Sequence, residues 1–326
     1  MAARLIRAGY PVQLVTSNPE ITGVVKSQGL KVKTLHEEFV QPAEAHTSLD
    51  DLPEGERFDL SLLVMKANPV VEVARKTIAY LDPENGYLVT CQNGIVEDAV
   101  AKAVGAGRVV SAIIGWGGTM HGPGSYEKTG PGSIHIGELD GRLSDRVKLL
   151  GGVLKKVTPV VVSTNIRGAL WSKLAINCII TTMGAVTGQN LGEMLVDRRI
   201  RQAFLIVYRE VIDTAAALGI ELERVAANPR LLYLPAGAGL LRRYFKDLLL
   251  QIMGRRYGRL RSSMLQSLQR GRPSEIDYLN GYVVQKAGEA GLQVPFNAAL
   301  VKMVKAIEAG TRQIEKTNMD ELTALL

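Results

Sequence analysis

Cysteine is scarce in this chain of 326 residues, because Cys91 and Cys178 are its only two and lie far apart. A disulfide framework and a cysteine-based zinc site are therefore excluded in practice, and a reducing, cytoplasmic location is expected. Aromatic residues make up 5%, which leaves few stacking platforms for single-stranded nucleic acid. Apolar runs such as Leu174–Ile180 are shorter than the roughly 18 residues of a membrane-spanning helix, and no basic-then-apolar leader is visible. We expect neither a membrane nor a nucleic-acid partner.

The charge balance is basic, with 39 Lys and Arg against 32 Asp and Glu and a formal net charge of +7. Seven of the basic residues lie in the stretch 242–261, which holds one acid, Asp247. No zinc finger, recognition helix or RNA-binding signature accompanies them, so an anionic small molecule suits this charge better than a nucleic acid. The spacing predicts an amphipathic helix with a solvated basic face and an apolar face made of Leu248, Leu249, Ile252 and Met253.

The first half of the chain alternates short β-rich runs with helical patterns, which indicates a parallel sheet wound with crossover helices. The predicted strands are Pro11–Thr16, Leu60–Lys66, Tyr87–Cys91, Val109–Ile114, Ser133–Glu138 and Val160–Ser163. The predicted helices of this half are Ala2–Ala8, Pro69–Leu81 and Glu97–Val104. From Asn165 onward the periodicity is helical, as in Ile200–Leu218 and in Asn297–Ala309, where Asn297 is the predicted N-cap. We therefore predict an α/β domain over 1–163 and an all-helical domain over 164–326.

The opening of the chain resembles a dinucleotide-binding domain that is entered after its first strand. Ala2–Ala8, Gly9 and the following strand reproduce the helix–glycine–strand order of a first crossover. Such a domain opens with a strand and a G-x-G-x-x-G turn, whose amides meet the pyrophosphate at the helix N-terminus. Neither precedes Ala2 in the sequence. The pattern favours a Rossmann-like domain whose first strand and glycine loop are missing over a different architecture.

Lys173 and Asn177 are the first candidates for chemistry, because they stand four residues apart on one face of an apolar helix. Such a lysine either extends its ammonium to water or is held in a cleft, where it can serve as a general acid or anion anchor. Lys66 stands at the end of the predicted strand Leu60–Lys66, and the pair Asn93-Gly94 follows Tyr87–Cys91, so both lie at the edge where open α/β sheets bind ligands. An ordinary turn explains Asn93-Gly94 equally well.

Two polar segments of the second half, Ser262–Gln266 and Gly271–Gly281, contain hydroxyls, carboxylates and an amide. Ser274 with Asp277 is typical of a helix start. Glu275 is open to two interpretations, as a dipole-compensating acid in a first helical turn or as a catalytic carboxylate.

Three segments, Lys173–Asn177, Ser262–Gln266 and Glu275–Gly281, resemble the ketopantoate reductase family (2-dehydropantoate 2-reductase) in their order and separation. The resemblance runs through nearly the whole chain. It implies an N-terminal dinucleotide-binding domain, a helical C-terminal domain and an active site in the cleft. It also implies hydride transfer from NADPH to the C2 ketone of ketopantoate, which gives pantoate for pantothenate and coenzyme A synthesis.

The resemblance also implies roles for individual residues. Lys173 would be the general acid that protonates the developing alkoxide, where a cation stabilises the transition state most. Glu275 would orient Lys173 or the substrate hydroxyl. The remaining implied contacts are Ser263 with the substrate carboxylate, Asn177 with a substrate oxygen, Asn93 with substrate and cofactor, and Lys66 and Ser17 with the cofactor.

The chain departs from the family pattern at two further positions. Thr16-Ser17-Asn18 stands where an arginine often holds the 2′-phosphate, and Thr181 stands where an asparagine is common. These departures leave two alternatives open: a reductase of another branched 2-oxoacid or opine-type substrate, and a truncated, non-catalytic relative without the cofactor loop. A homodimer is a further expectation, since apolar helical domains of this sort often pair.

Overall fold

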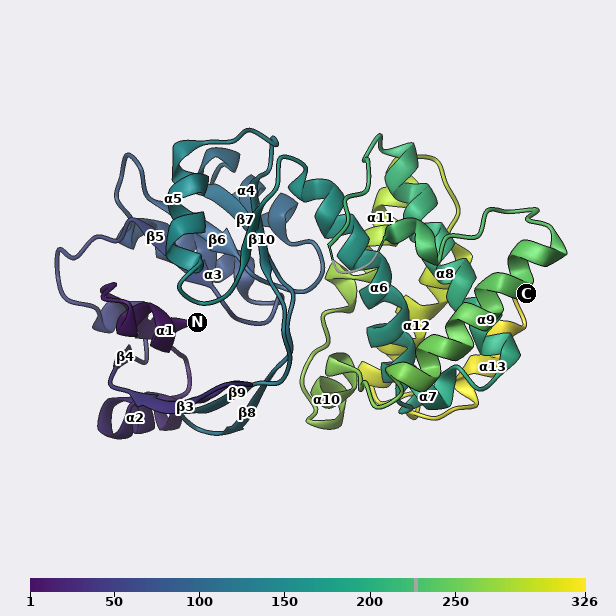
Figure 1. Ribbon diagram of the computed structural model, residues 1–326, viewed down its shortest axis with the longest axis horizontal. Helices are drawn as coiled ribbons and strands as arrows, with labels where there is room; N and C mark the ends of the chain where they lie inside the picture. Colours follow the sequence, from purple (N-terminus) through teal and green to yellow (C-terminus); the bar gives the residue numbers. More distant parts are fainter. Residues whose placement is uncertain (226–227) are drawn as a thin grey trace. The chain divides into compact units, whose positions relative to one another are not determined.

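The computed structural model describes residues 1–225 and 228–326 and divides the chain into two compact units (Figure 1). The N-terminal unit comprises Met1–Val64, Val70–Cys91 and Glu97–Ile166. The C-terminal unit comprises Arg167–Leu326 together with two short segments of the first half, Met65–Pro69 and Gln92–Val96. Two loops that follow strands of the α/β unit therefore group with the helical unit.

The N-terminal unit is built on a five-stranded sheet in the order β11-β10-β7-β6-β5. Its strands are β5 (Leu60–Leu63), β6 (Tyr87–Thr90), β7 (Val109–Ile114), β10 (Ile134–Glu138) and β11 (Val160–Val162). The prediction of a parallel sheet is confirmed for β5, β6 and β7, whereas β10 runs antiparallel to β7 and parallel to β11. All of β6 and nearly all of β7 are buried, as expected for strands covered on both faces.

Helices cover this sheet and close its core. They are α3 (Val70–Thr77), α4 (Glu97–Val104) and α5 (Asp145–Leu154). The Ser144 side chain caps α5 by accepting a hydrogen bond from the Val147 amide. Val147 and Leu150 then pack on Ile134 and Ile136 of β10 in one apolar cluster. Each such buried aliphatic side chain stabilises the fold by roughly 1.5–3 kcal/mol.

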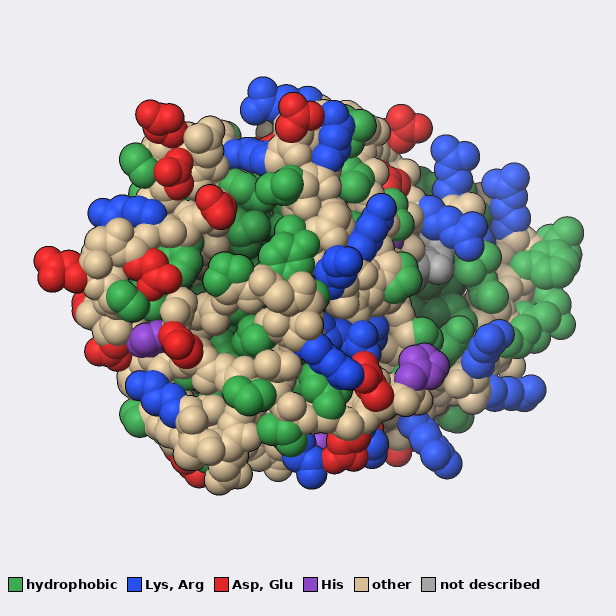
Figure 2. Space-filling view, turned by 60° about the vertical axis from the view of Figure 1, so that its left-hand side comes forward, with side chains coloured by type: hydrophobic (Ala, Val, Ile, Leu, Met, Phe, Trp, Pro, Cys, Tyr) green, Lys and Arg blue, Asp and Glu red, His purple; other side chains and the backbone are tan. Residues whose placement is uncertain are grey.

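The rest of the N-terminal unit contains short, half-exposed elements that periodicity largely misses. A two-stranded parallel sheet pairs β1 (Gln13–Val15) with β4 (Glu44–His46), beside α1 (Ala2–Arg7) and α2 (Pro19–Gln28). A four-stranded sheet has the order β3-β2-β9-β8 and consists of β2 (Leu30–Lys33), β3 (Glu38–Gln41), β8 (Gly118–Gly122) and β9 (Ser125–Lys128). These strands carry Lys, Glu and Gly instead of a continuous apolar run, so the sequence gives little indication of them. Figure 2 shows acidic, basic and hydrophobic side chains interspersed over the face turned to the viewer.

The C-terminal unit is helical. Its helices are α6 (Ile166–Thr187), α7 (Leu191–Met194), α8 (Arg198–Ala217), α9 (Leu240–Arg256), α10 (Ser263–Gln269), α11 (Asn280–Glu289), α12 (Pro295–Glu308) and α13 (Asn318–Thr323). By length and composition α6, with 22 residues, could cross a membrane, which the short apolar runs did not indicate. Its apolar window is 72% buried, so it is a core helix of this unit.

Asn297 does not cap α12, which corrects the prediction. The helix begins at Pro295, and Asn297 lies inside its first turn with no exposed surface. Proline suits the first helical position because its fixed φ is helical and it has no amide to satisfy. The buried Glu210 carboxylate instead accepts the amides of Phe296 and Asn297, at 3.0 and 2.9 Å.

The buried face of α9 also differs from the prediction. Of the predicted apolar face, Leu249 and Met253 are half-buried, whereas Leu248 and Ile252 are exposed. The fully buried residues are Leu250 and Gly254, and the exposed apolar residues also include Leu240, Leu241, Tyr244 and Phe245. The reason is a close approach of α7, because a Cβ on Gly192 would lie 3.2 Å from the Gly254 carbonyl oxygen. Hydrophobic side chains gather beside Lys and Arg side chains in the right-hand part of Figure 2.

Candidate active site

Lys173 and Asn177 lie on the core helix α6, one turn apart, and both are half-buried. Trp171, two residues before Lys173, packs its ring against Tyr282 of α11, with the ring centroids 5.8 Å apart. Among the described residues, the Asn177 Nδ2 group is buried and has no hydrogen-bond partner. A buried amide without a partner costs about 1–3 kcal/mol, so it marks a place where a ligand oxygen would be stabilising.

Cys178, the next residue along α6, does not supply a nucleophile. Burial raises the pKa of the Cys178 thiol well above its usual range, so the thiol stays neutral.

Glu275 is held on both carboxylate oxygens. Lys66 Nζ donates to Oε2 at 2.9 Å, and the Ala67 amide donates to Oε1 at 3.0 Å. The Glu275 side chain is 8% exposed and that of Lys66 is 53% exposed, so a buried carboxylate meets a cation that reaches water. Glu275 stands at the N-cap of the short 3₁₀ turn that follows it and makes no side-chain capping hydrogen bond there, so its two oxygens serve Lys66 and Ala67.

The predicted helix start at Ser274 and Asp277 is a short 3₁₀ turn, Ile276–Tyr278, and α11 begins only at Asn280. Ser274 Oγ accepts a hydrogen bond from the Ile276 amide, while Asp277 pairs with Lys305 of α12 at 2.6 Å. Asn68 Nδ2 also donates to the Ser274 carbonyl at 2.9 Å, so Lys66, Ala67 and Asn68 all hydrogen-bond to residues 274–275.

Asn93 is exposed, and its neighbour Gly94 fixes the turn on the same segment. Gly94 has φ +86, and a Cβ there would lie 2.3 Å from the Tyr278 carbonyl oxygen. The next amide, that of Ile95, donates to this oxygen at 3.0 Å. Asn93-Gly94 is therefore a turn that requires glycine, and it anchors Asn93 against residues 275–278.

Ser263 is exposed at the first position of α10. Its neighbour Ser262 is buried and has a structural role: Ser262 Oγ accepts the Leu265 amide at 3.0 Å and donates to the Thr181 carbonyl of α6 at 2.5 Å. Six of the predicted site residues therefore lie on segments of this unit that hydrogen bonds connect. Lys173 and Asn177 share α6, to which Ser262 and Asn280 bond. The others are Lys66, Asn93, Ser263 and Glu275.

Ser17, predicted for the cofactor, belongs to the N-terminal unit. It lies two residues after β1 and is exposed, while Asn18 caps α2 by accepting hydrogen bonds from the Glu20 and Ile21 amides. In this unit the exposed Ser17 hydroxyl is a donor that suits a ribose or phosphate oxygen, and in the C-terminal unit the exposed Lys66 ammonium is another. Each of them fits a phosphorylated dinucleotide by its chemistry, although the sequence holds no glycine turn for the pyrophosphate.

The groups that hold the candidate side chains in place have little or no signal in the sequence. The backbone amide of Ala67 carries no side-chain signal, and Asn68 follows Lys66 without belonging to a motif. Asn280 was within the motif Glu275–Gly281 but had no assigned role, and it bonds to α6 at Cys178 and Thr182.

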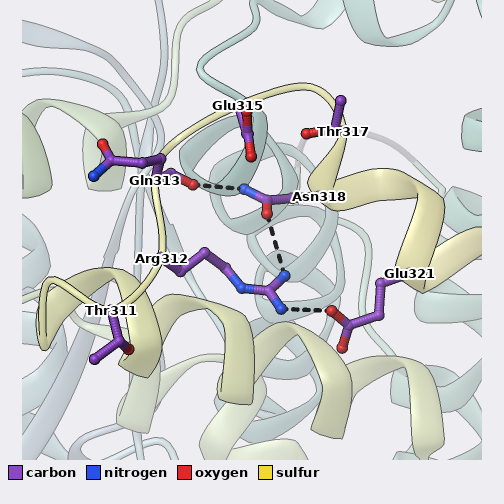
Figure 3. Close-up of a pocket in the computed structure, with 7 residues that line it drawn as sticks. All are labelled: Thr311, Arg312, Gln313, Glu315, Thr317, Asn318 and Glu321. Atoms are coloured by element: carbon purple, nitrogen blue, oxygen red, sulfur yellow. Dashed lines mark hydrogen bonds and ion pairs between the residues drawn. The ribbon is translucent and has the colours of Figure 1, made fainter.

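A separate cavity of about 370 Å³ lies near the C-terminus, lined by Thr311, Arg312, Gln313, Glu315, Thr317, Asn318 and Glu321. Figure 3 shows Arg312 extending between Asn318 and Glu321. Arg312 pairs with Glu321 at 2.5 Å, and Asn318 uses both of its amide hydrogens on backbone carbonyls. Glu321 neutralises the Arg312 cation of this cavity, and none of the candidate residues lines the cavity. We therefore do not assign the cavity to the active site.

Comparison with known proteins identifies the family of this chain. Residues 1–141 match the family described as ketopantoate reductase PanE/ApbA, and residues 165–308 match its C-terminal domain. The 2-dehydropantoate 2-reductase of Archaeoglobus fulgidus is 26% identical over 305 residues, which cover 93% of this chain and 92% of that protein.

Solved structures share the fold. The PanE/ApbA family ketopantoate reductase from Ralstonia eutropha JMP134 is 25% identical and has a TM-score of 0.79, with 95% of this chain and 94% of that chain covered. D-mandelate dehydrogenase, solved with NADH and anilino(oxo)acetate, is 20% identical and has a TM-score of 0.78, with 94% of each chain covered. The second likeness shows the fold alone.

Proposed function

Because this chain belongs to the ketopantoate reductase family, we propose that it reduces the C2 ketone of 2-dehydropantoate (ketopantoate) to the alcohol of pantoate with NADPH. NADPH, when bound, supplies the hydride and becomes NADP⁺. As the C2 ketone accepts that hydride and its carbonyl π electrons move to oxygen, Lys173 Nζ would donate a proton to the developing alkoxide. A cation beside that oxygen accelerates the step, because the negative charge appears there only in the transition state.

The buried Asn177 Nδ2, which has no hydrogen-bond partner among residues 1–225 and 228–326, carries this proposal. One turn after Lys173 on α6, it offers two N–H donors to a substrate oxygen without the loss of any existing hydrogen bond. Ser263, exposed at the start of α10, would bind the substrate carboxylate, and Asn93 would complete the contacts.

Glu275 has a defined role in this scheme. Its two oxygens already accept from Lys66 and from the Ala67 amide, which holds the carboxylate in one orientation. It would orient the substrate hydroxyl or Lys173 from that position. Lys66 and Ser17 would hold the cofactor, and the excess of basic residues attracts both anionic ligands.

The test is NADPH oxidation by the purified chain with ketopantoate and a panel of other branched 2-oxoacids. Turnover of ketopantoate at the highest kcat/KM supports the proposal, whereas turnover of another acid alone would assign the alternative substrate class. A folded chain that turns over none of them would contradict the enzyme assignment and support a non-catalytic relative.

Lys173→Ala tests the assigned general acid. We expect kcat for ketopantoate reduction to fall by about 10²–10³, since one preorganised donor to an oxyanion contributes that much. NADPH affinity and Tm should stay near those of the parent. Lys302→Ala, which alters an exposed lysine of α12, is the matched control and should leave kcat unchanged. An unaltered rate in Lys173→Ala would remove the assigned role.

A further inference from the structure

The sequence motifs of the second half converge on one turn of α6, residues 178–182. The Asn280 side chain spans this turn: its Nδ2 donates to the Cys178 carbonyl at 3.2 Å, and its Oδ1 accepts from Thr182 Oγ1 at 2.5 Å. Ser262 donates to the Thr181 carbonyl of the same turn. Segments that begin near Glu275 and near Ser263 are thus tied to the helix that carries Lys173 and Asn177.

Asn280 and its partners are deeply buried. Asn280, Thr182 and Asn297 have no exposed surface. The second hydrogen of Asn280 Nδ2 bonds to Asn297 Oδ1 at 2.9 Å, and Asn297 Nδ2 donates in turn to Glu210 Oε2 at 2.7 Å. Every polar atom of the Asn280 amide is therefore satisfied, and in the dry interior these hydrogen bonds are strong and costly to break.

The pattern of donors and acceptors at α6 fits an amide side chain. Cys178 presents an acceptor and Thr182 a donor, four residues apart on one helical face. A carboxylate in place of the Asn280 amide would set an acceptor against the Cys178 carbonyl. An apolar side chain would leave the Thr182 hydroxyl buried without a partner, which costs about 1–3 kcal/mol.

We propose that Thr182 and Asn280 are positioning residues for ketone reduction, because their hydrogen bond fixes Glu275 relative to Lys173 and Asn177. This inference rests on the proposed function. Asn280 begins α11, two residues after the 3₁₀ turn that follows Glu275, and Cys178 directly follows Asn177. The hydrogen bonds of Asn280 to α6 therefore join the two sets of reacting groups by a short covalent path. Lys66 and Ala67 donate hydrogen bonds to the Glu275 carboxylate. Asn280, five residues later, connects the same segment to α6 through Cys178 and Thr182.

Thr182→Val is the main test, because valine keeps the shape of threonine and removes only the hydroxyl. We expect kcat to fall about tenfold or more, since small displacements of reacting groups reduce rates strongly, while KM for NADPH stays within about twofold. Thr182→Ser keeps the hydroxyl and should restore kcat to within about threefold of the parent. Thr77→Val removes a similarly buried hydroxyl, bonded only within α3, and should leave kcat unchanged.

A second readout does not depend on activity. Amide hydrogen exchange should accelerate in peptides covering 173–182 and 275–281 in Thr182→Val, and remain at the parent rate there in Thr77→Val. If Thr182→Val does not fold, Thr182→Ala is measured in the same way. A parent without turnover contradicts the proposed function, and the exchange result then decides the inference. Parent-like kcat, or parent-like exchange in both peptides, from a folded variant overturns the inference.

Discussion

Asn177 combines a structural cost with a functional use. Its buried Nδ2 has no partner among the described residues, whereas the amide of Asn318, also buried, donates to the carbonyls of Val186 and Gln313. Proteins retain such unsatisfied groups where a ligand satisfies them, and stability at these sites is reduced in favour of activity. The two asparagines therefore offer a matched comparison.

Asn177→Leu should leave the free energy of unfolding unchanged or raise it by about 1 kcal/mol, because the mutation removes an unsatisfied buried donor. The same change should lower kcat/KM for ketopantoate by at least about tenfold, since the substrate oxygen loses its donor. Urea unfolding and steady-state kinetics measure the two effects. Asn318→Leu should instead destabilise the chain by about 2 kcal/mol with kcat/KM unchanged. Marked destabilisation of Asn177→Leu would show that the amide has a structural partner.

The turn at Gly94 shows how a backbone position sets the site at the scale of an element. Its φ of +86 and its approach to the Tyr278 carbonyl leave no room for a Cβ. Gly94→Ala should therefore destabilise the protein by roughly 2–3 kcal/mol, through strain and through displacement of the segment 275–278. Differential scanning calorimetry measures the change in Tm.

Gly288→Ala on α11 is the control for that substitution. The exposed Gly288 has open space around its Cβ position, so alanine should stabilise the helix by about 0.5–1 kcal/mol. Equal stability of Gly94→Ala and the parent would remove the argument that this turn requires glycine.

The contact between α8 and α9 depends on one partly buried ion pair. Arg201, 6% exposed, donates to both carboxylate oxygens of Asp247, at 2.6 and 3.1 Å. Burial by itself would raise the pKa of Asp247, but hydrogen bonds from Arg201 and Gln251 and the charge of Arg201 hold it below its ordinary value of 3.8. Because the folded pKa is depressed, this stabilisation is present above pH 3.8 and is lost as pH falls through the folded value.

Asp247→Asn should therefore destabilise the chain by about 2 kcal/mol at pH 7, since Arg201 is left buried without a counter-charge. The difference from the parent should shrink as the pH falls below 3.8 and through the lower folded pKa of Asp247, where the parent carboxylate also becomes protonated. Urea titrations at several pH values measure it. Asp145→Asn, at a nearly fully exposed pair with Lys148, should have no measurable effect at any of them. A difference that is constant with pH would contradict the ion-pair explanation.

At the scale of the whole molecule, cofactor binding is the property on which the proposed reduction depends. NADPH should bind the folded chain and raise its Tm, because a ligand at 100 times its Kd adds about 2.7 kcal/mol to stability. Isothermal titration calorimetry with NADPH, and with NADH for comparison, measures this affinity. Binding of NADH alone would correct the cofactor assignment, and binding of neither would show that this form of the chain lacks a usable site. The homodimer stays a prediction, which sedimentation velocity tests.

The sequence by itself determined the broad architecture and the candidate residues. Continuous apolar strands such as Val109–Ile114 and strongly periodic helices such as α8 follow from local patterns, because burial on one face or both leaves a direct record in residue order. The motifs around Lys173, Ser263 and Glu275 were visible for the same reason, since their residues are close in sequence.

Only the tertiary structure decided how those motifs act together. The exposed stripe on α9 depends on where α7 packs, and the position of Asn297 depends on a carboxylate 87 residues away, at Glu210. Glu275 meets Lys66 and Ala67 across more than 200 residues of sequence, and Asn280 meets Cys178 and Thr182 across about 100. Such contacts leave no periodicity in the sequence, because hydrogen-bond partners are chosen by distance and burial in the folded chain.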